Sequence, residues 1–485
     1  PVVHAESVTE HRDSSNLDNQ SDKIVLKSAE SASDAATNDA PRPEGNVVAR
    51  GEDGVPWELY ENGYLLFKPE AGKDTLTNNN GDTTWKREHG AEIKHVGFAG
   101  KVYSPAYSHR LFSRYSDNDE FIDRNFIPIT LDTTNLDTSK VIDMSSMFDS
   151  LSELTHLDVT HFDTSNVTNM SSLFSGMWKL TDLDVTHFDT SNVTNMNRMF
   201  ESLMYLTNLD VTHFDTSNVT NMSHMFSGLT RLTNLDVTRF NTSNVTDMSG
   251  MFNGLYSLTD LDVTHFDTNK VTDMSSMFSA SGNLTHLDLT KLNTSNVTNM
   301  SDMFASSSLT DLDVTHFDTS KVTNMSNMFS GMDLTHLSLT TFDTSNVTNM
   351  SGMFDTMVKL TDLDVTHFDT SKVTDMSRMF HDVRNLTNLD ITNFDTHNVT
   401  NMANMFGNMY NLKELDVTHF DTSKVTNMEG MFSDARNLTS LDITNFDTNN
   451  VTNMNDMFGH TYPHLFNQLK ELKIGDKFKA DGIST

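Results

Sequence analysis

Apolar and polar residues alternate in a run that returns along most of the chain. The run LDVTHFDTSNVTNM occupies residues 157–170, and a close copy begins at Leu183. Leu157 and Val159 alternate with polar neighbours, which is the period of a half-buried β-strand. The sequence DTSN follows, and its side chains can bond nearby backbone groups in a turn. VTNM then predicts a second short extended segment, with its Val facing inward.

The end of each copy has a different period. The segment SSLFSGM begins at Ser171, a residue type that caps helices. In the copy two repeats later, Met222, Met225 and Phe226 lie at positions i, i+3 and i+4, which share one face of a helix. Each copy therefore predicts short strands followed by a short helix.

The copies recur every 26 residues, except for two intervals of 25 that end at Leu312 and Leu337. One copy cannot bury its apolar side chains alone, but stacked copies can. The methionines in the repeat are expected to fill this shared core, since Met adapts to irregular gaps. The sequence predicts an α/β-type solenoid that coils in a right-handed sense. The 13 copies begin at Leu131, Leu157, Leu183, Leu209, Leu235, Leu261, Leu287, Leu312, Leu337, Leu363, Leu389, Leu415 and Leu441.

The flanking segments have other compositions. The first 50 residues contain no Phe, Trp or Tyr, which predicts a disordered segment. VPWELYENGYLLFKP predicts a hairpin that turns at Asn62-Gly63, within an N-terminal cap. Ile93, Val96, Phe98 and the Leu111-Phe112 pair echo the repeat. The expected division is 1–50 disordered, 51–130 cap, 131–474 array with a terminal half repeat, and 475–485 tail.

The two ends leave questions open. The chain begins with PVVHA, which fits either a processed start after a signal peptide or an arbitrary start. Near the other end, LKELKI at residues 469–474 predicts one last strand. No closing cap is evident after it, so further protein is expected to follow.

Composition limits the partners. The net charge is −34 and the pI about 4.7, which disfavours nucleic acid and anionic membrane surfaces. There is no cysteine, hence no disulfide or thiolate metal site, and no apolar run of membrane-spanning length. Cations, basic proteins and neutral glycans remain as candidates. No sequence motif of a hydrolase, metalloprotease or nucleotide-binding site is present, so an enzyme is not expected.

The repeat LTDLDVTHFDTSNVTNMSSMF resembles the leucine-rich repeats of BspA-like surface proteins from Gram-positive bacteria, notably lactic acid bacteria. The likeness covers about residues 131–474. It implies a leucine-rich-repeat-like coil and a secreted, wall-associated protein of adhesin type, although no wall-anchoring module is present in the sequence.

Aspartate and threonine form files on the predicted strand face. Carboxylates about 4.8 Å apart repel by roughly 1 kcal/mol in water. Four factors can reduce this repulsion: solvent water and salt, shifted pKa values, hydrogen bonds from threonine, or bound cations such as calcium. A simpler interpretation is that these charges keep a long array soluble. The candidate ligand-binding residues are Asp158, Thr160, Asp184, Thr186, Asp210, Thr212, Asp236, Thr238, Asp262, Thr264, Asp364 and Thr366.

A file rich in histidine follows the Asp/Thr file. An imidazole beside acids is expected to hold its proton to higher pH, so the array is expected to be more stable at mildly acidic pH or with divalent cations. The turn aspartates, such as Asp163, are expected to cap the local backbone instead. The pH-responsive candidates are His161, His187, His213, His265, His316, His367 and His419.

Two functions from different classes remain open. The first is an extracellular adhesin whose repeated strand face binds host mucin, matrix protein or glycan, because repetition makes weak contacts multivalent. The second is a passive stalk, or a cation-stiffened wall component, that presents another domain. No cofactor is expected, although calcium is possible, and the sequence alone leaves the oligomeric state open.

Overall fold

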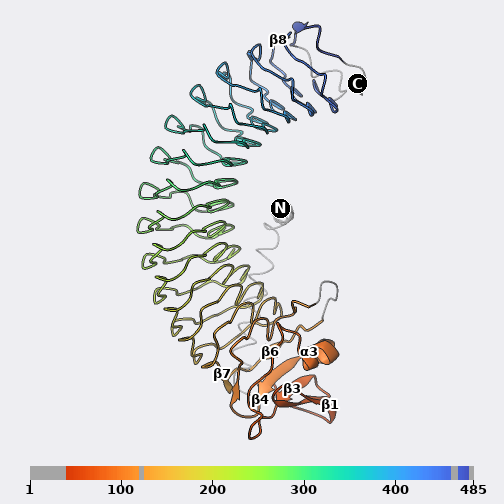
Figure 1. The fold of residues 1–485 in the computed structure, drawn as a ribbon, viewed down its shortest axis with the longest axis vertical. Coiled ribbons are helices and arrows are strands. Elements are labelled where there is room, and N and C mark those ends of the chain that lie inside the picture. The colour runs from red at the N-terminus through yellow and green to blue at the C-terminus, as the bar shows by residue number, and fades with distance from the viewer. Residues whose placement is uncertain (1–39, 119–124, 460–467, 480–485) are drawn as a thin grey trace.

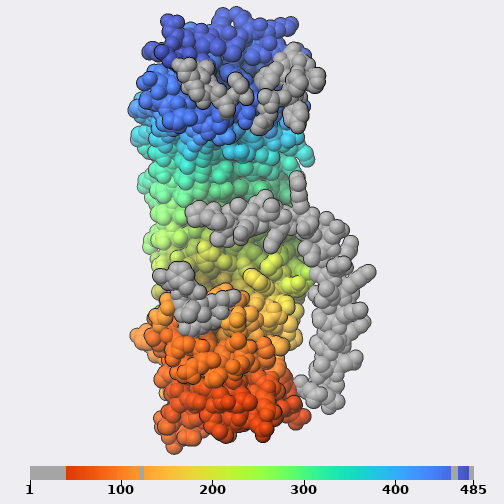
Figure 2. All heavy atoms as spheres, turned by 90° about the vertical axis from the view of Figure 1, so that its right-hand side faces the viewer, coloured from red at the N-terminus to blue at the C-terminus, as the bar shows by residue number. Residues whose placement is uncertain are grey.

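A computed structural model describes residues 40–118, 125–459 and 468–479. The chain forms a β-solenoid of about 13 turns. The turns stack into one continuous arc, in which they lie closer together on the concave side and fan out on the convex side (Figure 1). Seen from the concave side, they form an unbroken body with the cap at one end (Figure 2). The predicted solenoid of stacked copies is confirmed at this level.

The N-terminal cap opens with an antiparallel meander. β1 (Val47–Glu52) pairs with β2 (Pro56–Tyr60), which pairs with β3 (Tyr64–Phe67). The predicted hairpin at Asn62-Gly63 is confirmed. Gly63 has a φ of 81°, which glycine adopts without strain, and its N–H donates to the Tyr60 oxygen at 2.9 Å. Because β1 begins at Val47, the expected end of the disordered segment at residue 50 is wrong; its first 39 residues lie outside the described part.

The cap then changes to parallel pairing. α3 (Thr84–His89) and the 3-10 turn η2 (Gly90–Glu92) lead into β4 (His95–Phe98), which pairs in parallel with both β3 and β6 (Thr130–Leu131). β5 (Val102–Tyr103) pairs in parallel with β7 (Leu136–Asp137). The cap therefore contains a coil-like turn that closes the end of the core.

Backbone hydrogen bonds join each coil to its neighbours along the VTNMSxMF segment. The Thr194 N–H donates to the Thr168 oxygen at 2.8 Å in the preceding coil, and the Met196 N–H donates to the Asn221 oxygen at 3.0 Å in the next. Bridges of this kind follow one another from Asp143 to Asn453. A direct ladder needs strands about 4.8 Å apart, so we assign it to the closely spaced, concave side.

The short helix expected in each repeat is wrong. Across the described coils this segment forms turns, and it contains two residues in the left-handed region four positions apart, such as Arg198 (φ 58°) and Ser202 (φ 61°). Both residues donate their N–H groups to the next coil, at 2.9 and 2.8 Å, instead of to a residue one helical turn earlier. The spacing of the buried Met and Phe residues is compatible with either structure, so it could not distinguish them.

The predicted LDVT strand is correct in burial but not in pairing. Leu157 and Val159 are buried, and Asp158 and Thr160 are exposed. In the described chain this segment pairs as a regular strand only at the two ends of the array. At the N-terminal end β6, which contains Leu131, pairs with β4, and at the C-terminal end β8 (Ser440–Ile443) lies parallel to β9 (Glu471–Ile474). The last strand predicted at residues 469–474 is thereby confirmed.

A column of stacked phenylalanines runs through the core. Phe226 is fully buried, with its ring centroid 5.8 Å from that of Phe200 and 6.0 Å from that of Phe252. The same register extends from Phe112 in the cap to Phe458 at the far end. Since the ring of each coil stacks on the rings of the preceding and the following coil, the core is continuous along the arc.

Candidate binding surfaces of the array

Each aspartate of the predicted strand face is bonded to the threonine two residues later in its own coil. Asp210 shows the geometry: its Oδ1 accepts the Thr212 N–H at 3.0 Å and the Thr212 hydroxyl at 2.6 Å. The same pair of bonds forms at Asp158, Asp184, Asp236, Asp262 and Asp364, with Thr160, Thr186, Thr238, Thr264 and Thr366. The candidate residues therefore form a series of local turns in equivalent exposed positions.

These bonds account for how the acidic file is tolerated. The hydroxyl of Thr212 is the largest influence on Asp210 and lowers the pKa of its carboxyl below the usual 3.8. Thr186 has the same effect on the pKa of Asp184, where the repulsive influence of Asp210 is the smallest contribution. Hydrogen bonds from threonine, one of the expected forms of relief, are confirmed. Among the described residues, no group of three or more His, Asp or Glu side chains is placed to hold a metal ion.

The histidine file lies next to these turns, on the exposed surface. His161, His367 and His419 each donate through Nε2 to a carbonyl oxygen of the preceding coil, at 2.8, 2.7 and 2.8 Å. Long side chains thus join coils where the LDVT backbone does not. The pH response of the file remains a prediction, tested by unfolding between pH 5 and 8 with and without calcium. The other candidates, His187, His213, His265 and His316, are exposed at the same register.

The residue before each repeat's first Leu forms a second exposed file. His156 Nδ1 lies 2.6 Å from Asp182 Oδ1 in the next coil, and His286 Nδ1 lies 2.9 Å from Asp311 Oδ1. His336 and Asp362 form a third pair of the same kind. These ion pairs are exposed, so they contribute little to stability.

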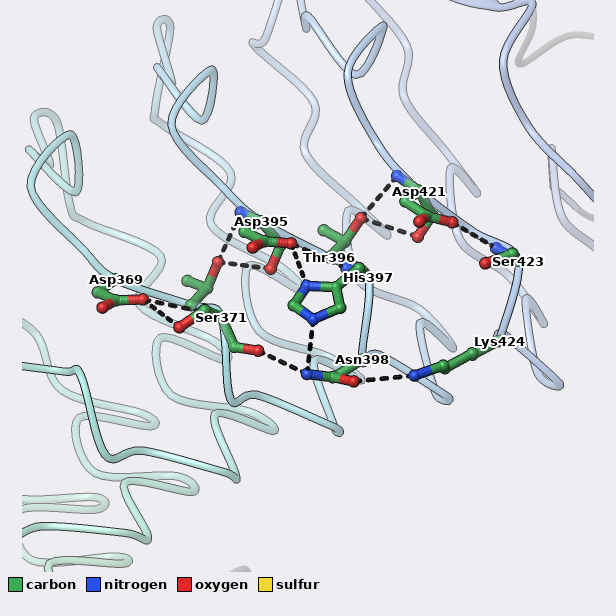
Figure 3. Close-up of polar contacts among 10 residues, drawn as sticks. Asp369, Ser371, Asp395, Thr396, His397, Asn398, Asp421, Ser423 and Lys424 are labelled. Atoms are coloured by element: carbon green, nitrogen blue, oxygen red, sulfur yellow. Dashed lines mark hydrogen bonds and ion pairs between the residues drawn. The ribbon is translucent and has the colours of Figure 1, made fainter.

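The DTSN turns contain a feature that sequence reasoning missed (Figure 3). The Thr396 hydroxyl donates to the Asp421 oxygen at 2.9 Å and accepts the Asp421 N–H at 2.8 Å, so it replaces a direct backbone bond between coils. The Asn398 Nδ2 donates to the Ser371 oxygen of the preceding coil at 2.8 Å, and Lys424 Nζ donates to the Asn398 Oδ1 at 3.0 Å. This turn is therefore a polar seam that holds neighbouring coils together.

The threonine in this seam is buried and present in every copy. Thr164 and Thr216 are each 1% exposed. A turn that needed only local bonds would accept Ser or Asn at this position, so the unvaried Thr was the available signal. The turn aspartates do cap the local backbone as expected: Asp163 Oδ1 accepts the Ser165 N–H at 3.0 Å.

The described residues contain no helix that is long and apolar enough to cross a membrane. Stacked coils with files of exposed polar side chains define a repeat scaffold, a β-solenoid.

The chain belongs to the family described as "Mycoplasma protein of unknown function, DUF285", whose model matches residues 119–233, 204–312, 306–413 and 383–474. A comparison with curated proteins gave no match.

Two solved structures of repeat proteins align with this chain. The functional domain of InlJ from Listeria monocytogenes is 21% identical, with a TM-score of 0.43, and the alignment covers 65% of this chain and 58% of that one. A leucine-rich cell surface protein from Faecalibacterium prausnitzii is 14% identical, with a TM-score of 0.31, and the alignment covers 90% of this chain and 89% of that one.

Proposed function

We propose that this protein is an extracellular adhesin of a Gram-positive bacterium, related to the BspA-like surface proteins, and that its array binds host mucin, matrix protein or glycan. The observation that supports it is the uninterrupted file of exposed aspartates, each bonded to the threonine of its turn, in seven consecutive coils from Asp158 to Asp313. A ligand with repeated groups gains from such a file, because each added weak contact becomes intramolecular.

The electrostatic state of the file suits this role. The pKa values of Asp184, Asp210 and Asp236 are lowered by their threonines, so the carboxylates stay charged at neutral and mildly acidic pH. Each ionised carboxylate can accept hydrogen bonds from hydroxyl or amide groups of a ligand.

The test measures binding of the full chain to immobilised mucin, collagen, laminin and fibronectin. One variant carries Asp→Asn at four adjacent coils: Asp184, Asp210, Asp236 and Asp262. Asn keeps an acceptor for Thr but removes the charge. The matched control is Asp182→Asn with Asp260→Asn, on the neighbouring exposed file.

We expect the four-coil variant to lose binding and the control to keep it. Equal binding by both would reject the Asp/Thr face. A wild-type chain that binds none of the probes would instead favour the alternative, a passive stalk that presents another domain.

A further inference from the structure

The repeat varies most just after its MF pair. Residues 175–179, SGMWK, occupy this position in one coil, and ESLMY and SGLTR occupy it in the next two. The third residue of each segment is fully buried; these residues are Met177, Leu203 and Leu229. The fourth and fifth residues lie at the surface, where the fold does not fix their identity.

Trp178 occupies one of these fourth positions. It is 51% exposed, whereas the other two tryptophans, Trp57 and Trp85, are 2% and 0% exposed in the cap. Thr230 and Gly282 stand at the same register in other coils. The array itself therefore shows that the fold needs no large apolar residue there, so Trp178 calls for another explanation.

Exposed side chains of the neighbouring coils lie next to Trp178 and form a larger surface with it. Met204, which follows Trp178 by one repeat, is 37% exposed. Beside it lies the ring of Tyr205, with the Arg231 guanidinium 4.3 Å from its centroid. On the other side, Lys179 Nζ lies 2.7 Å from Glu153 Oε2. We call this group, Trp178, Lys179, Met204, Tyr205 and Arg231, the Trp178 surface.

We propose that the Trp178 surface is a second binding surface, which takes a protein partner that presents an apolar side chain beside an acidic one. This proposal rests on the proposed function and adds a site to it. Trp, Tyr, Met and Arg are the side chains enriched where proteins bind each other, and Trp, Tyr and Arg dominate hot spots.

Two features favour a protein over a glycan at this surface. The Met204 thioether is only a weak acceptor and donates nothing, so it offers sugar hydroxyls little, while it packs well against apolar side chains. Arg231 places positive charge over the ring of Tyr205, whereas the charge of Lys179 is offset by Glu153, on a chain whose net charge is −34. An acidic partner segment is therefore attracted here and repelled by most of the remaining surface.

The experiment uses the full chain and two groups of probes: collagen, laminin and fibronectin with their glycans removed, and glycans released from mucin. The variant Trp178→Thr with Met204→Thr removes the apolar groups, and Thr230 shows that Thr suits this register. The control is Val358→Thr, at the same register in a distant coil. Arg231→Glu reverses charge without altering the apolar groups, and it decides the question if the double variant fails to fold.

We expect the double variant to bind a protein probe about tenfold more weakly, or worse, with glycan binding and the Val358→Thr control unchanged. Arg231→Glu should slow association with the same probe. Wild-type affinity in both variants, or a loss confined to the glycans, would overturn the proposal. A wild-type chain that binds glycans alone would also overturn the proposal for the Trp178 surface, but it would leave the adhesin function intact. A chain that binds no probe would reject both the Trp178 surface and the adhesin function.

Discussion

The hydroxyl of Thr216 is inserted between two coils at Asn241: Oγ1 donates to the Asn241 oxygen at 2.9 Å and accepts the Asn241 N–H at 2.8 Å. One side chain thus satisfies both backbone groups of a residue in the next coil. Since Thr216 is 1% exposed, water does not readily replace it. This contact recurs along the seam and explains how coils stay joined where their backbones do not pair directly.

Replacement of Thr216 by Val should therefore be costly. The shape is kept, but the Asn241 N–H and carbonyl lose their partner, at about 1 to 3 kcal/mol of unfolding free energy. Because contacts in a solenoid are made between neighbours, the effect should centre on the adjoining coils. Hydrogen exchange should show faster exchange near Asn241, and urea unfolding should give the overall loss.

The control is Thr233→Val, at an exposed position near the end of the same repeat. It should change the free energy of unfolding by less than about 0.5 kcal/mol. Equal effects of the two substitutions would show that the seam hydroxyl does not hold the coils together.

The phenylalanine column predicts unequal effects of two core substitutions. Phe226→Ala should destabilise by about 3 to 5 kcal/mol, because it opens a cavity between Phe200 and Phe252. Phe266→Leu, at the phenylalanine of the HFDT run, whose ring centroid lies 6.1 Å from that of Phe252, should cost less than about 1.5 kcal/mol, as expected for a similar-volume change. Leu292 already fills the equivalent site one coil later, where it is 4% exposed. Chemical denaturation measures both, and a cost at Phe266 equal to that at Phe226 would contradict this account.

The left-handed positions can be tested with the residues that the array itself uses. Ser202 has a φ of 61°, and the equivalent Gly176 and Gly228 have φ values of 74° and 77°. Left-handed backbone costs a non-glycine residue about 1 to 2 kcal/mol. Ser202→Gly should therefore raise the melting temperature, and Ser202→Val should lower it.

The matched control is the same pair of changes at Ser165, a turn residue outside this set. There Gly should lower the melting temperature, because it adds backbone freedom to the unfolded chain. A stabilising Gly at both sites would argue against strain at Ser202.

The acidic file predicts a loss of stability in acid. The pKa values of Asp184, Asp210 and Asp262 are lowered below 3.8 in the folded chain, chiefly by the threonine hydroxyls. The folded state therefore binds fewer protons than the unfolded state in this range. The contribution is fully present above the ordinary pKa and is lost as the pH falls through the folded values. Urea unfolding at about pH 6 and about pH 3 should show the decrease.

A variant with Thr→Val at Thr186, Thr212, Thr238 and Thr264 should reduce that pH dependence, since the carboxyls lose their main donor. Thr→Val at Thr207 and Thr233, exposed positions outside these turns, should leave it unchanged. An undiminished pH dependence in the four-coil variant would show that the threonine hydroxyls do not set these pKa values.

The sequence by itself determined the solenoid, its 26-residue period, the cap hairpin at Asn62-Gly63, the last strand, and the inward and outward positions of each repeat. These features depend on local pattern, because a buried column must be apolar in every copy and a tight turn needs glycine. Tertiary structure decided how the coils are joined. Met222, Met225 and Phe226 have helical spacing, but their segment forms turns because its backbone donors bond to neighbouring coils. The sequence identifies Thr216 only as a turn residue; the structure shows that it bonds to Asn241 of the next coil. Contacts between coils depend on backbone spacing around the arc, which no single repeat specifies.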